Sequence, residues 1–552
     1  MTLKKNDSIE LAITGMTAQG SGVGRYAGIA VFVANAAVGD RLKIKIIKTS
    51  KNYAIGKIEE ILAPSPARIS ADCEAFKSCG GCVYRHIRYE SELSIKEQRV
   101  KDALVRIGGF TQIKVNPIIG APNTEGYRNK AQLPVGRGKD GGLLFGFYAF
   151  KSHRIVDCSG CRLQPPVFAQ ALAVIKEWAA RYNPSVYDEQ SHTGKLRHIY
   201  LRYGEKTGEL MVCLVINGER LEGEQVLAQS LQEKAKGFQS LVININRERT
   251  NVILGKKCRT VYGQGFITDI LCGLRFKLSP LSFYQVNAQQ AERLYEKARE
   301  YAALKQGETL LDLYCGTGTI GLTMAGQAGE VIGVEAVEQA VLDARENAAH
   351  NGIKNARFIC ADAVQAAQTL KQEGVTPDVI ILDPPRKGCD RALIDIVAGM
   401  RPQRVVYVSC DPATLARDLK AFFQSGYVPQ KVTPIDMFPR TAHVETVVLL
   451  GREKSTDDIV YGYVDYEPKN EDYIQDMKGN ATYGEIKDWI KEEYGFSVSS
   501  LYVAQIKEKY GFEKRPNYNI GDKKSRVPNC PPEKEKAIVE AFKHFKMIDI
   551  IK

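Results

Sequence analysis

The sequence predicts an α/β protein: a mainly parallel β-sheet with helices on both faces, preceded by a small β-barrel and an α+β insert and followed by a helical extension. Between residues 285 and 451, apolar strand-like runs alternate with amphipathic helical segments, which is typical of a parallel sheet covered on both faces. Residues 8–62 instead alternate apolar and polar positions between glycines, as in a small antiparallel barrel. After residue 482, apolar residues recur at helical spacing.

Length and charge narrow the class of protein. With 552 residues, the chain is long enough for about three or four folding units. Its 76 Lys and Arg residues exceed its 64 Asp and Glu residues, for a formal net charge of +12. This balance favours an acidic partner such as nucleic acid, although a mildly basic enzyme without such a partner has the same charge.

The expected compartment is the cytoplasm. The Met-Thr-Leu-Lys-Lys start lacks the apolar segment of a signal peptide, and we find no apolar run long enough to cross a bilayer. The 13 cysteines are few for so long a chain, which argues against a disulfide scaffold. We therefore expect reduced thiols that are free for catalysis or metal binding.

Residues 1–63 contain the predicted barrel. Barrels of this size often bind oligonucleotides, and a purely structural barrel is the alternative. Its basic side chains favour RNA as the ligand. They are Arg25, Lys43, Lys45, Lys48, Lys51 and Lys57.

A cysteine-rich loop is expected at residues 64–90. It contains Cys73, Cys79 and Cys82 with two glycines between the last two, and Cys158 and Cys161 follow far downstream. Three clustered thiols and a fourth would suit an iron-sulfur cluster or a zinc ion, because both accept four thiolates. The spacing does not choose between these two, and simple free thiols are a third interpretation.

The next two segments have different patterns. Residues 91–284 are predicted to form an α+β insert that covers the active site and contacts the substrate, because strand-like runs at 143–150, 199–203 and 210–216 are separated by turn residues. In residues 285–451 we expect helices at 287–303, 319–327 and 338–350 and strands at 309–313, 330–335, 356–360, 378–382, 404–409 and 444–450.

Residues 452–552 read as a linker followed by a helical module. Thr482 and Glu485 form a capping box ahead of apolar residues at helical spacing, and Gly495 is expected to end that helix. Two further helices at about 499–510 and 531–546 complete a module that resembles a helix-turn-helix. Such a module could contact nucleic acid, and a docking or stabilising role is an equal alternative.

A glycine turn follows the first predicted strand of the parallel sheet. Asp312-Leu313-Tyr314-Cys315-Gly316-Thr317-Gly318 leads from that strand into a helix, so Gly316 would let a ligand approach the backbone at the helix N-terminus. This pattern would also suit a dinucleotide-binding protein. Glu335, at the next strand end, could hold ribose hydroxyls in either class.

Acidic residues follow the third and fourth strands. Ligands in open α/β sheets lie at the carboxyl ends of strands, where Asp362 could meet an adenine ring. Asp383-Pro384-Pro385-Arg386 is rigid at two successive φ angles, so it could hold a carboxylate against a planar base. An ordinary turn is the alternative, and the buried strand before it, 379–382, argues against that alternative.

Cys410 ends the fifth strand and precedes the helix start Asp411-Pro412. A helix N-terminus favours the thiolate, so we expect a lowered pKa and a nucleophilic role. A strand-end cysteine is more often core filler, and Cys389 and Cys315 are rival nucleophiles.

Glu445 opens an apolar strand two residues after His443. Carboxylates are rarely buried without a specific function, and general-base catalysis is one such function for an inward-facing Glu445. A solvated strand-end carboxylate is the alternative. The H-x-E pattern also begins the zinc deaminase signature, but no P-C-x-x-C follows it.

Together these motifs resemble the RNA uracil-C5 methyltransferase family, S-adenosylmethionine-dependent enzymes that act on ribosomal or transfer RNA. The resemblance covers residues 8–451 and implies a class I (Rossmann-like) methyltransferase domain at 285–451. It also implies that Cys410 is the nucleophile and Glu445 the general base. The donor-binding positions that it implies are Gln285, Tyr314, Glu335 and Asp383.

Relatives with these motifs have an N-terminal TRAM barrel and a 4Fe-4S cluster whose last ligand lies in a C-x-L-Q segment. The resemblance therefore implies a cluster on Cys73, Cys79, Cys82 and Cys161. The tRNA-specific branch generally lacks both features, so 23S ribosomal RNA is the implied substrate. Two departures are Thr319, where many relatives have asparagine, and the segment after residue 455, which lies outside the family core.

The implied reaction is methyl transfer from S-adenosylmethionine to carbon 5 of a specific uridine, through a covalent adduct of Cys410 at carbon 6. Glu445 would then remove the carbon 5 proton. The alternatives are a tRNA uridine-C5 methyltransferase, an RNA cytosine-C5 methyltransferase and a non-catalytic RNA-binding assembly factor. The sequence selects neither the uridine nor an oligomeric state.

Overall fold

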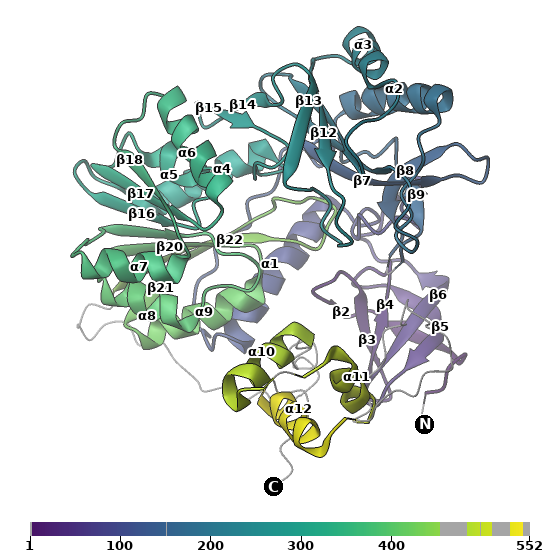
Figure 1. Cartoon of the computed structure of the whole chain (residues 1–552). Coiled ribbons are helices and arrows are strands. Elements are labelled where there is room, and N and C mark those ends of the chain that lie inside the picture. Colours follow the sequence, from purple (N-terminus) through teal and green to yellow (C-terminus); the bar gives the residue numbers. More distant parts are fainter. Residues whose placement is uncertain (1–2, 151, 453–482, 497, 510–529, 545–552) are drawn as a thin grey trace. The chain divides into compact units, whose positions relative to one another are not determined.

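The computed structural model describes residues 3–150, 152–452, 483–496, 498–509 and 530–544. The chain divides into two compact units, Met1–Tyr466 and Glu467–Lys552. The first unit contains three large sheets and the second three helices (Figure 1). Of the described helices, none is both long and apolar enough to span a membrane.

The N-terminal sheet confirms the predicted small barrel. Its six strands lie in the order β1-β5-β6-β4-β3-β2. They are β1 (Ser8–Ala12), β2 (Gly15–Met16), β3 (Gly22–Tyr26), β4 (Ile29–Val33), β5 (Arg41–Thr49) and β6 (Tyr53–Ala63). In β5, Leu42, Ile44 and Ile46 are buried while Lys43 and Lys45 are exposed, because successive side chains of a strand point to opposite faces. One face of this strand therefore packs the core and the other offers cations to solvent.

The central segment has helices on one face of a seven-stranded sheet. The helices are α2 (Pro166–Tyr182) and α3 (Glu224–Lys234), and α1 (Tyr89–Arg106) precedes the sheet in sequence. The strands, in spatial order, are β13 (Lys257–Tyr262), β12 (Phe238–Ile245), β11 (Leu210–Ile216), β10 (Leu196–Tyr203), β7 (Lys130–Arg137), β8 (Leu143–Tyr148) and β9 (Ile155–Asp157). Apolar residues of α2 and α3 form one core with alternate residues of β7, β10, β11 and β12 (Figure 1). On the other face, Tyr200, Met211 and Val242 belong to a separate core that also contains apolar residues of the helix Ala288–Ala302.

The third large sheet confirms the predicted methyltransferase-type α/β core. Its strand order is β18-β17-β16-β19-β20-β22-β21. The strands are β16 (Thr309–Leu313), β17 (Glu330–Glu335), β18 (Ala356–Cys360), β19 (Val379–Leu382), β20 (Arg404–Ser409), β21 (Tyr427–Ile435) and β22 (Glu445–Arg452). The first five in spatial order are parallel, and β22 and β21 close the sheet antiparallel.

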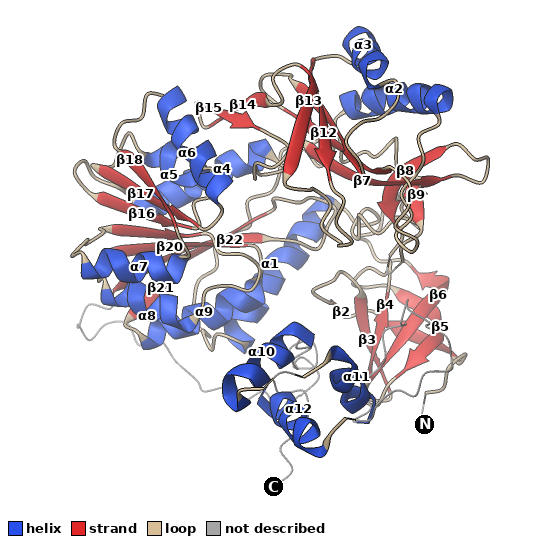
Figure 2. Cartoon of the chain, viewed as in Figure 1, coloured by secondary structure: helices blue, strands red, loops and turns tan. Residues whose placement is uncertain are grey.

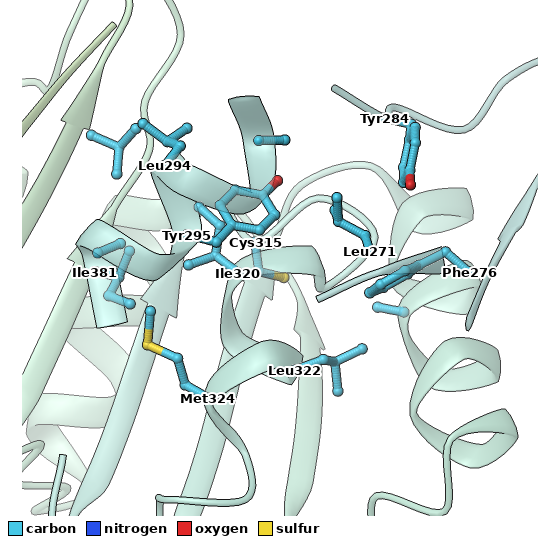
Figure 3. Packing of buried hydrophobic residues seen from close by; sticks show 14 of the residues in the cluster. Leu271, Phe276, Tyr284, Leu294, Tyr295, Cys315, Ile320, Leu322, Met324 and Ile381 are labelled. Carbon is cyan, nitrogen blue, oxygen red and sulfur yellow. The ribbon is translucent and has the colours of Figure 1, made fainter. Parts of the chain in front are cut away.

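Helices cover both faces of this sheet (Figure 2). On one face are α4 (Ala288–Ala302), α5 (Thr319–Met324) and α6 (Glu338–His350), and on the other are α7 (Ala363–Gln372), α8 (Arg391–Gly399) and α9 (Pro412–Gln424). The first layer shares its core with the hairpin of β14 (Ile267–Leu271) and β15 (Leu274–Leu278), where Tyr295, Cys315 and Ile320 pack together (Figure 3). The carboxyl ends of the parallel strands meet at one edge, which is where ligands of such sheets bind.

The C-terminal unit is a helical module with its own core. Its helices are α10 (Tyr483–Tyr494), α11 (Ser500–Lys509) and α12 (Pro532–His544). Ile490, Val503 and Ile538 are among the fully buried residues that join them. Gly495 has φ of +71° and follows the last residue of α10, as expected. Thr482 of the expected capping box lies outside the described residues.

Candidate active site at the sheet edge

The glycine turn joins β16 to α5 in a conformation that side chains rarely adopt. Tyr314 has φ of +68°, Gly316 +55° and Gly318 +81°. Positive φ in a tyrosine costs free energy, and such outliers cluster at ligand sites. Below the turn, the buried Asp312 accepts a hydrogen bond from the Gly321 backbone N–H at 2.9 Å, which fixes the start of α5 against the strand.

Two acidic residues border this turn. Oε2 of Glu335 accepts from the Gly316 N–H at 3.1 Å and Oε1 from the Val337 N–H at 2.9 Å, so its carboxylate lies directly over the turn. Oδ1 of Asp362 caps α7 by accepting from the Val364 N–H at 2.9 Å. The structure therefore places Gly316 and Glu335 together, and gives Asp362 a capping function that the sequence analysis did not predict.

The register of the sheet brings Asp383, Cys410 and Glu445 to one edge. Asp383 follows β19, whose last residue Leu382 pairs with Tyr407 of β20. Ser409, the last residue of β20, pairs with Thr446 of the antiparallel β22. One residue further along the same register, Cys410 faces Glu445. A thiol and two carboxylates thus meet beside the glycine turn, where the parallel strands end.

Burial dominates the electrostatics of this group. Burial raises the pKa of Glu445 to about 8, and the nearby Asp383 carboxylate adds to the effect while Arg386 opposes it. Burial alone raises the pKa of Asp383 to about 7. Both carboxyl groups are therefore poised near neutral pH, as groups that exchange protons in a reaction are.

The pKa of Cys410 differs from the expectation. Its position before a helix N-terminus predicts a lowered pKa, whereas burial, followed by the charges of Glu445 and Asp383, raises the pKa to about 11. Desolvation and two like charges outweigh the helix and the single cation, Arg386, that favours the thiolate. The thiol is thus protonated at rest and needs a proton acceptor when it reacts.

The two rival cysteines lie in packed cores. Cys389 is buried on the α7–α9 side, where its backbone N–H donates to Asp418 at 2.8 Å and burial raises its thiol pKa to about 12. Cys315 is buried among residues of the opposite layer, beside Tyr295 and Ile320 (Figure 3). Neither thiol shares the strand-end environment of Cys410.

Two basic residues beside the site, a cationic arginine and a neutral histidine, were not predicted to act there. Arg386, the fourth residue of the Asp-Pro-Pro-Arg segment, acts electrostatically on Cys410, Glu445 and His443. His443 is half-buried, and burial together with Arg386, Arg99 and other cations lowers its pKa to about 4. For Arg386, the only indication of a role in the sequence was its place in the Asp-Pro-Pro-Arg segment, because a sequence does not show which way a side chain points.

A buried ion network supports the loop before Glu445. Lys96 Nζ on α1 donates to Glu92 Oε1 and to Asp436 Oδ1, both at 2.7 Å. Tyr89 Oη donates to Asp436 Oδ2 at 2.7 Å, and the Arg440 N–H donates to Glu92 Oε1 at 2.7 Å. The network fixes residues 436–440 against α1, and thereby the entry to β22. The sequence analysis missed it because helix α1 itself was not predicted.

The remaining predicted donor residues lie at the entry to α4 and on the turn. Gln285 is half-buried, and its backbone carbonyl accepts from Asn129 Nδ2 at 2.9 Å. Thr319 Oγ1 lies 3.0 Å from Tyr295 Oη, so this hydroxyl is engaged within the core. The loss of asparagine at position 319 is thus matched by an internal hydrogen bond.

The four predicted cysteine ligands and Cys158, the alternative to Cys161, are neighbours. A hydrogen bond from Cys158 lowers the pKa of Cys79, and Cys161 interacts electrostatically with Cys79 and Cys73. Burial raises the pKa of Cys82 to about 11, although the nearby Arg85 guanidinium acts to lower it. Within the part of the chain that the structure describes, however, no group of three or more His, Cys, Asp or Glu side chains is arranged to hold a metal ion.

Polar groups around these thiols lack partners. Nε of Arg85, Nε of Arg128 and both amide atoms of Gln164 are buried without a hydrogen-bond partner. Gln164 also lines a hollow of about 400 Å³ beside Cys161. Buried donors without acceptors are uncommon, and here they surround a set of thiols, so the residues present suit an additional anionic group.

Comparison with known families matches two segments of the chain. Residues 88–453 match the tRNA (uracil-5-)-methyltransferase family, and residues 3–58 match the TRAM domain. An uncharacterized RNA methyltransferase of Clostridium tetani is 43% identical over 448 residues, which are 81% of this chain and 97% of that protein. One of Caldanaerobacter subterraneus is 45% identical over 82% of this chain and 99% of its own length.

Among solved structures, the Pyrococcus abyssi tRNA (uracil-54, C5)-methyltransferase in complex with S-adenosyl-L-homocysteine is similar to this chain. The TM-score is 0.65 at 29% sequence identity, and the match covers 80% of this chain and 99% of that one. The similarity therefore extends over most of this chain and nearly all of that enzyme.

Proposed function

The chain belongs to the tRNA (uracil-5-)-methyltransferase family and is an RNA methyltransferase, and from that premise we propose that it transfers a methyl group from S-adenosylmethionine to carbon 5 of a uridine in RNA. The observation that supports the proposal is the register of β20 and β22, in which Ser409 pairs with Thr446, so that Cys410 and Glu445 are the next residues along the two strands. Both interact electrostatically with Asp383. This reaction needs a nucleophile and a base that can both reach the same pyrimidine ring.

The covalent step explains why a thiol is required. Carbon 5 of uracil is a poor nucleophile, so the Cys410 sulfur would add to carbon 6, its proton passing to a nearby acceptor, and leave an enolate. Carbon 5 of this enolate would attack the methyl group of the donor, whose sulfur–methyl bond breaks, and S-adenosylhomocysteine would leave. Glu445 then takes the proton from carbon 5. The electron pair of that C–H bond restores the 5,6 double bond and expels the Cys410 thiolate, which yields 5-methyluridine and free enzyme.

We assign the donor site to the glycine turn and its neighbours. Glu335, which accepts from the Gly316 N–H, would bind ribose hydroxyls, and Asp362 would contact the adenine with the oxygen that does not cap α7. Gln285, Tyr314 and Asp383 complete this assignment. Asp383, poised between its acid and carboxylate forms, would also hydrogen-bond the polar edge of the uracil.

We propose 23S ribosomal RNA as the substrate. The support is the combination of a TRAM barrel with the cysteine loop, which resembles the ribosomal branch of the family, and a net charge of +12 that suits a polyanion. We further propose a role for each segment. Residues 1–63 bind RNA, residues 64–90 form the cysteine loop, residues 91–284 form the insert that contacts the substrate, and residues 285–451 carry out methyl transfer. We also propose that the enzyme works in the cytoplasm.

Transfer RNA is the second candidate, because the Pyrococcus abyssi enzyme that resembles this chain acts on a tRNA uracil. A cytosine-C5 reaction would use the same thiol chemistry, and a non-catalytic assembly factor would keep the fold.

The deciding experiment is incubation of unmodified ribosomal and transfer RNA with labelled donor, followed by mapping of the labelled nucleoside. 5-Methyluridine in 23S RNA is expected. Label in tRNA alone refutes the substrate assignment, 5-methylcytidine refutes the reaction, and donor binding without labelling supports the assembly factor.

We also propose that Cys73, Cys79, Cys82 and Cys161 hold a 4Fe-4S cluster. A cluster takes one thiolate per iron, so its ligands stand further apart than the four ligands of a single zinc ion. The unpaired Nε donor of Arg85, which lies beside Cys82, would offset part of its negative charge. When bound, it would supply a rigid, redox-active anchor for the loop. Iron and sulfide analysis of protein purified without oxygen tests this: Cys161→Ser should lose the iron and Cys158→Ser should keep it.

A further inference from the structure

Lys130 begins strand β7 on the face of the central sheet that points away from α2 and α3. In the antiparallel pairing of β7 and β10, Lys130 lies opposite Arg202. Ala131 and Leu133, the residues of opposite orientation, are buried under α2 and α3, so Lys130 faces away from those helices. Like charges directly opposite each other in a sheet are destabilising, and this pair therefore calls for a compensating anion.

No described acidic side chain provides that anion. No hydrogen bond or ion pair joins the Lys130 side chain to another described residue, and its electrostatic neighbours are two further cations, Arg202 and Arg128. Burial, and then these two charges, lower the pKa of Lys130 to about 8. Nε of Arg202 and Nε of Arg128 are buried without partners. Three cations thus converge with unused hydrogen-bond donors and without a carboxylate.

The surroundings place this cationic group beside the proposed donor site. Asn129, next to Lys130, donates to the Gln285 carbonyl and accepts no side-chain bond at its own amide oxygen. The Arg202 guanidinium donates to the carbonyls of Ser279 at 2.7 Å and Ser282 at 2.8 Å, in the segment that leads to Gln285.

The same group also approaches the proposed base. Arg128 acts electrostatically on His443, two residues before Glu445. Its neighbour Tyr127 donates from Oη to the Pro439 carbonyl at 2.9 Å, so the 127–130 segment is bound to the loop that enters β22. The cations therefore lie between the central sheet and both segments that position the reacting groups.

We propose that Lys130, with Arg128 beside it, binds a backbone phosphate of the RNA strand that carries the target uridine. A phosphate supplies the missing negative charge and accepts hydrogen bonds from several cations at once. Because a uridine must leave its stack to reach Cys410, the phosphates next to it need a fixed position, and a contact at this place would provide one. The inference rests on the proposed function, since it places the strand relative to Cys410.

The test compares Lys130→Met, which keeps the aliphatic stem, and Lys130→Arg with a matched control, Lys354→Met. Lys354 is exposed in the loop between α6 and β18, and no described residue is bonded to its side chain. RNA affinity of the full-length protein is measured between about 50 and 200 mM salt with a ribosomal RNA transcript, together with donor affinity and steady-state methylation.

For Lys130→Met we expect RNA affinity to fall about tenfold and the slope of log affinity against log salt to become shallower by about 1, as for the loss of one phosphate contact. The KM for RNA should rise with little change in kcat or donor affinity. Lys130→Arg should restore the slope, and Lys354→Met should match the wild type.

Two results would overturn the inference: a Lys130→Met protein whose slope equals that of the control, or one that loses donor affinity and thermal stability together with RNA affinity, which would make Lys130 a structural residue. The proposed function fails separately. A wild-type protein that binds the transcript with a Lys130-dependent slope but forms no 5-methyluridine would keep the phosphate site and refute the reaction. A wild-type protein without RNA affinity would refute both.

Discussion

At the scale of single residues, the environment of Cys410 sets the order of proton transfers. Its thiol has a pKa raised to about 11 by burial and by Glu445 and Asp383, so it is protonated at neutral pH. Addition to carbon 6 therefore requires that the proton leave as the bond forms. Glu445 and Asp383, which contribute to the raised pKa, are also candidate acceptors for that proton. In the proposed reaction, the rate should therefore depend on the charge state of these three groups.

Replacing Cys410 separates donor binding from catalysis. We expect Cys410→Ala to bind S-adenosylmethionine normally and to lose methylation by more than about a thousandfold, because no other group can form the adduct. Equilibrium dialysis and single-turnover assays measure the two quantities. Cys389→Ala is the matched control: its thiol is packed under α8 and α9, so it should cost stability and keep activity. Near wild-type turnover by Cys410→Ala would refute the covalent scheme.

Removing the base should stop the reaction after methyl transfer. In Glu445→Gln the amide cannot accept the carbon 5 proton, so the enzyme should remain bonded to methylated RNA through Cys410. A protein-RNA band that survives denaturation and carries label from the donor is the expected readout, and the double variant with Cys410→Ala should lack it. Absence of the band in the single variant would move the base to another residue.

The rate of product release should depend on pH. Only ionised Glu445 can take the proton, and its pKa is about 8, so adduct resolution should rise with pH through about 8 and then level off. Asp383→Asn removes a like charge, and the midpoint should move to lower pH. Rapid-quench measurements across pH 6–10 would show this, and an identical midpoint in both proteins would exclude the coupling.

The same raised pKa of Glu445 also affects stability. It favours folding at low pH, and that contribution is lost as pH rises from the ordinary pKa of 4.5 through about 8.

At the scale of elements, a helix cap positions the proposed nucleophile. Asp411 Oδ1 accepts from the Ala413 N–H at 2.9 Å and the Thr414 N–H at 3.1 Å, and Cys410 is the residue immediately before this cap. Asp411→Ala should destabilise the protein by about 1 kcal/mol in urea unfolding and lower the rate of adduct formation. Asp411→Asn, which can still cap, should restore most of both. A variant that loses stability without any change in rate would uncouple the cap from the thiol.

Regular elements of the parallel sheet were predictable because each has a simple period. The strands at 309–313, 330–335 and 356–360 and the helix at 338–350 have the predicted bounds, since apolar runs there are bordered by glycines or by polar turns. Strand β21 was missed because Pro429 and Pro434 interrupt its pattern. An edge strand tolerates proline, and β21 also has a register shift between Pro429 and Lys431.

The candidate site was predictable only in part, for a related reason. Asp383 and Cys410 follow parallel neighbours, so a shared sheet edge was expected from the alternation of strands and helices. The proximity of Cys410 and Glu445 depends on β22 pairing antiparallel with β20, and local sequence does not specify pairing partners. The raised pKa of Cys410 was also beyond the sequence, because desolvation depends on the whole neighbourhood.

At the scale of the whole molecule, the C-terminal unit is a separate addition to the enzyme. The family match ends at residue 453, and helices α10–α12 enclose their own apolar core. A protein truncated after Tyr466 should therefore keep donor affinity and methylation within about threefold, because separate compact units usually fold alone. The assays used for Cys410 measure this, with the full-length chain as the reference. A truncated protein that folds but no longer methylates would assign the helical unit a part in substrate capture.

Arg440 has a consequence for the enzyme as a whole. This residue has φ of +68°, its carbonyl accepts from the N–H groups of Val83 and Tyr84 at 2.9 and 3.2 Å, and its own N–H donates to Glu92. The backbone of this one residue thus ties the end of the cysteine loop to α1 and to the chain that reaches Glu445 five residues later. If the proposed cluster were lost and Cys82 moved, the shift would pass through Arg440 toward the proposed base, so intactness of the cysteine loop and speed of adduct resolution should fall together.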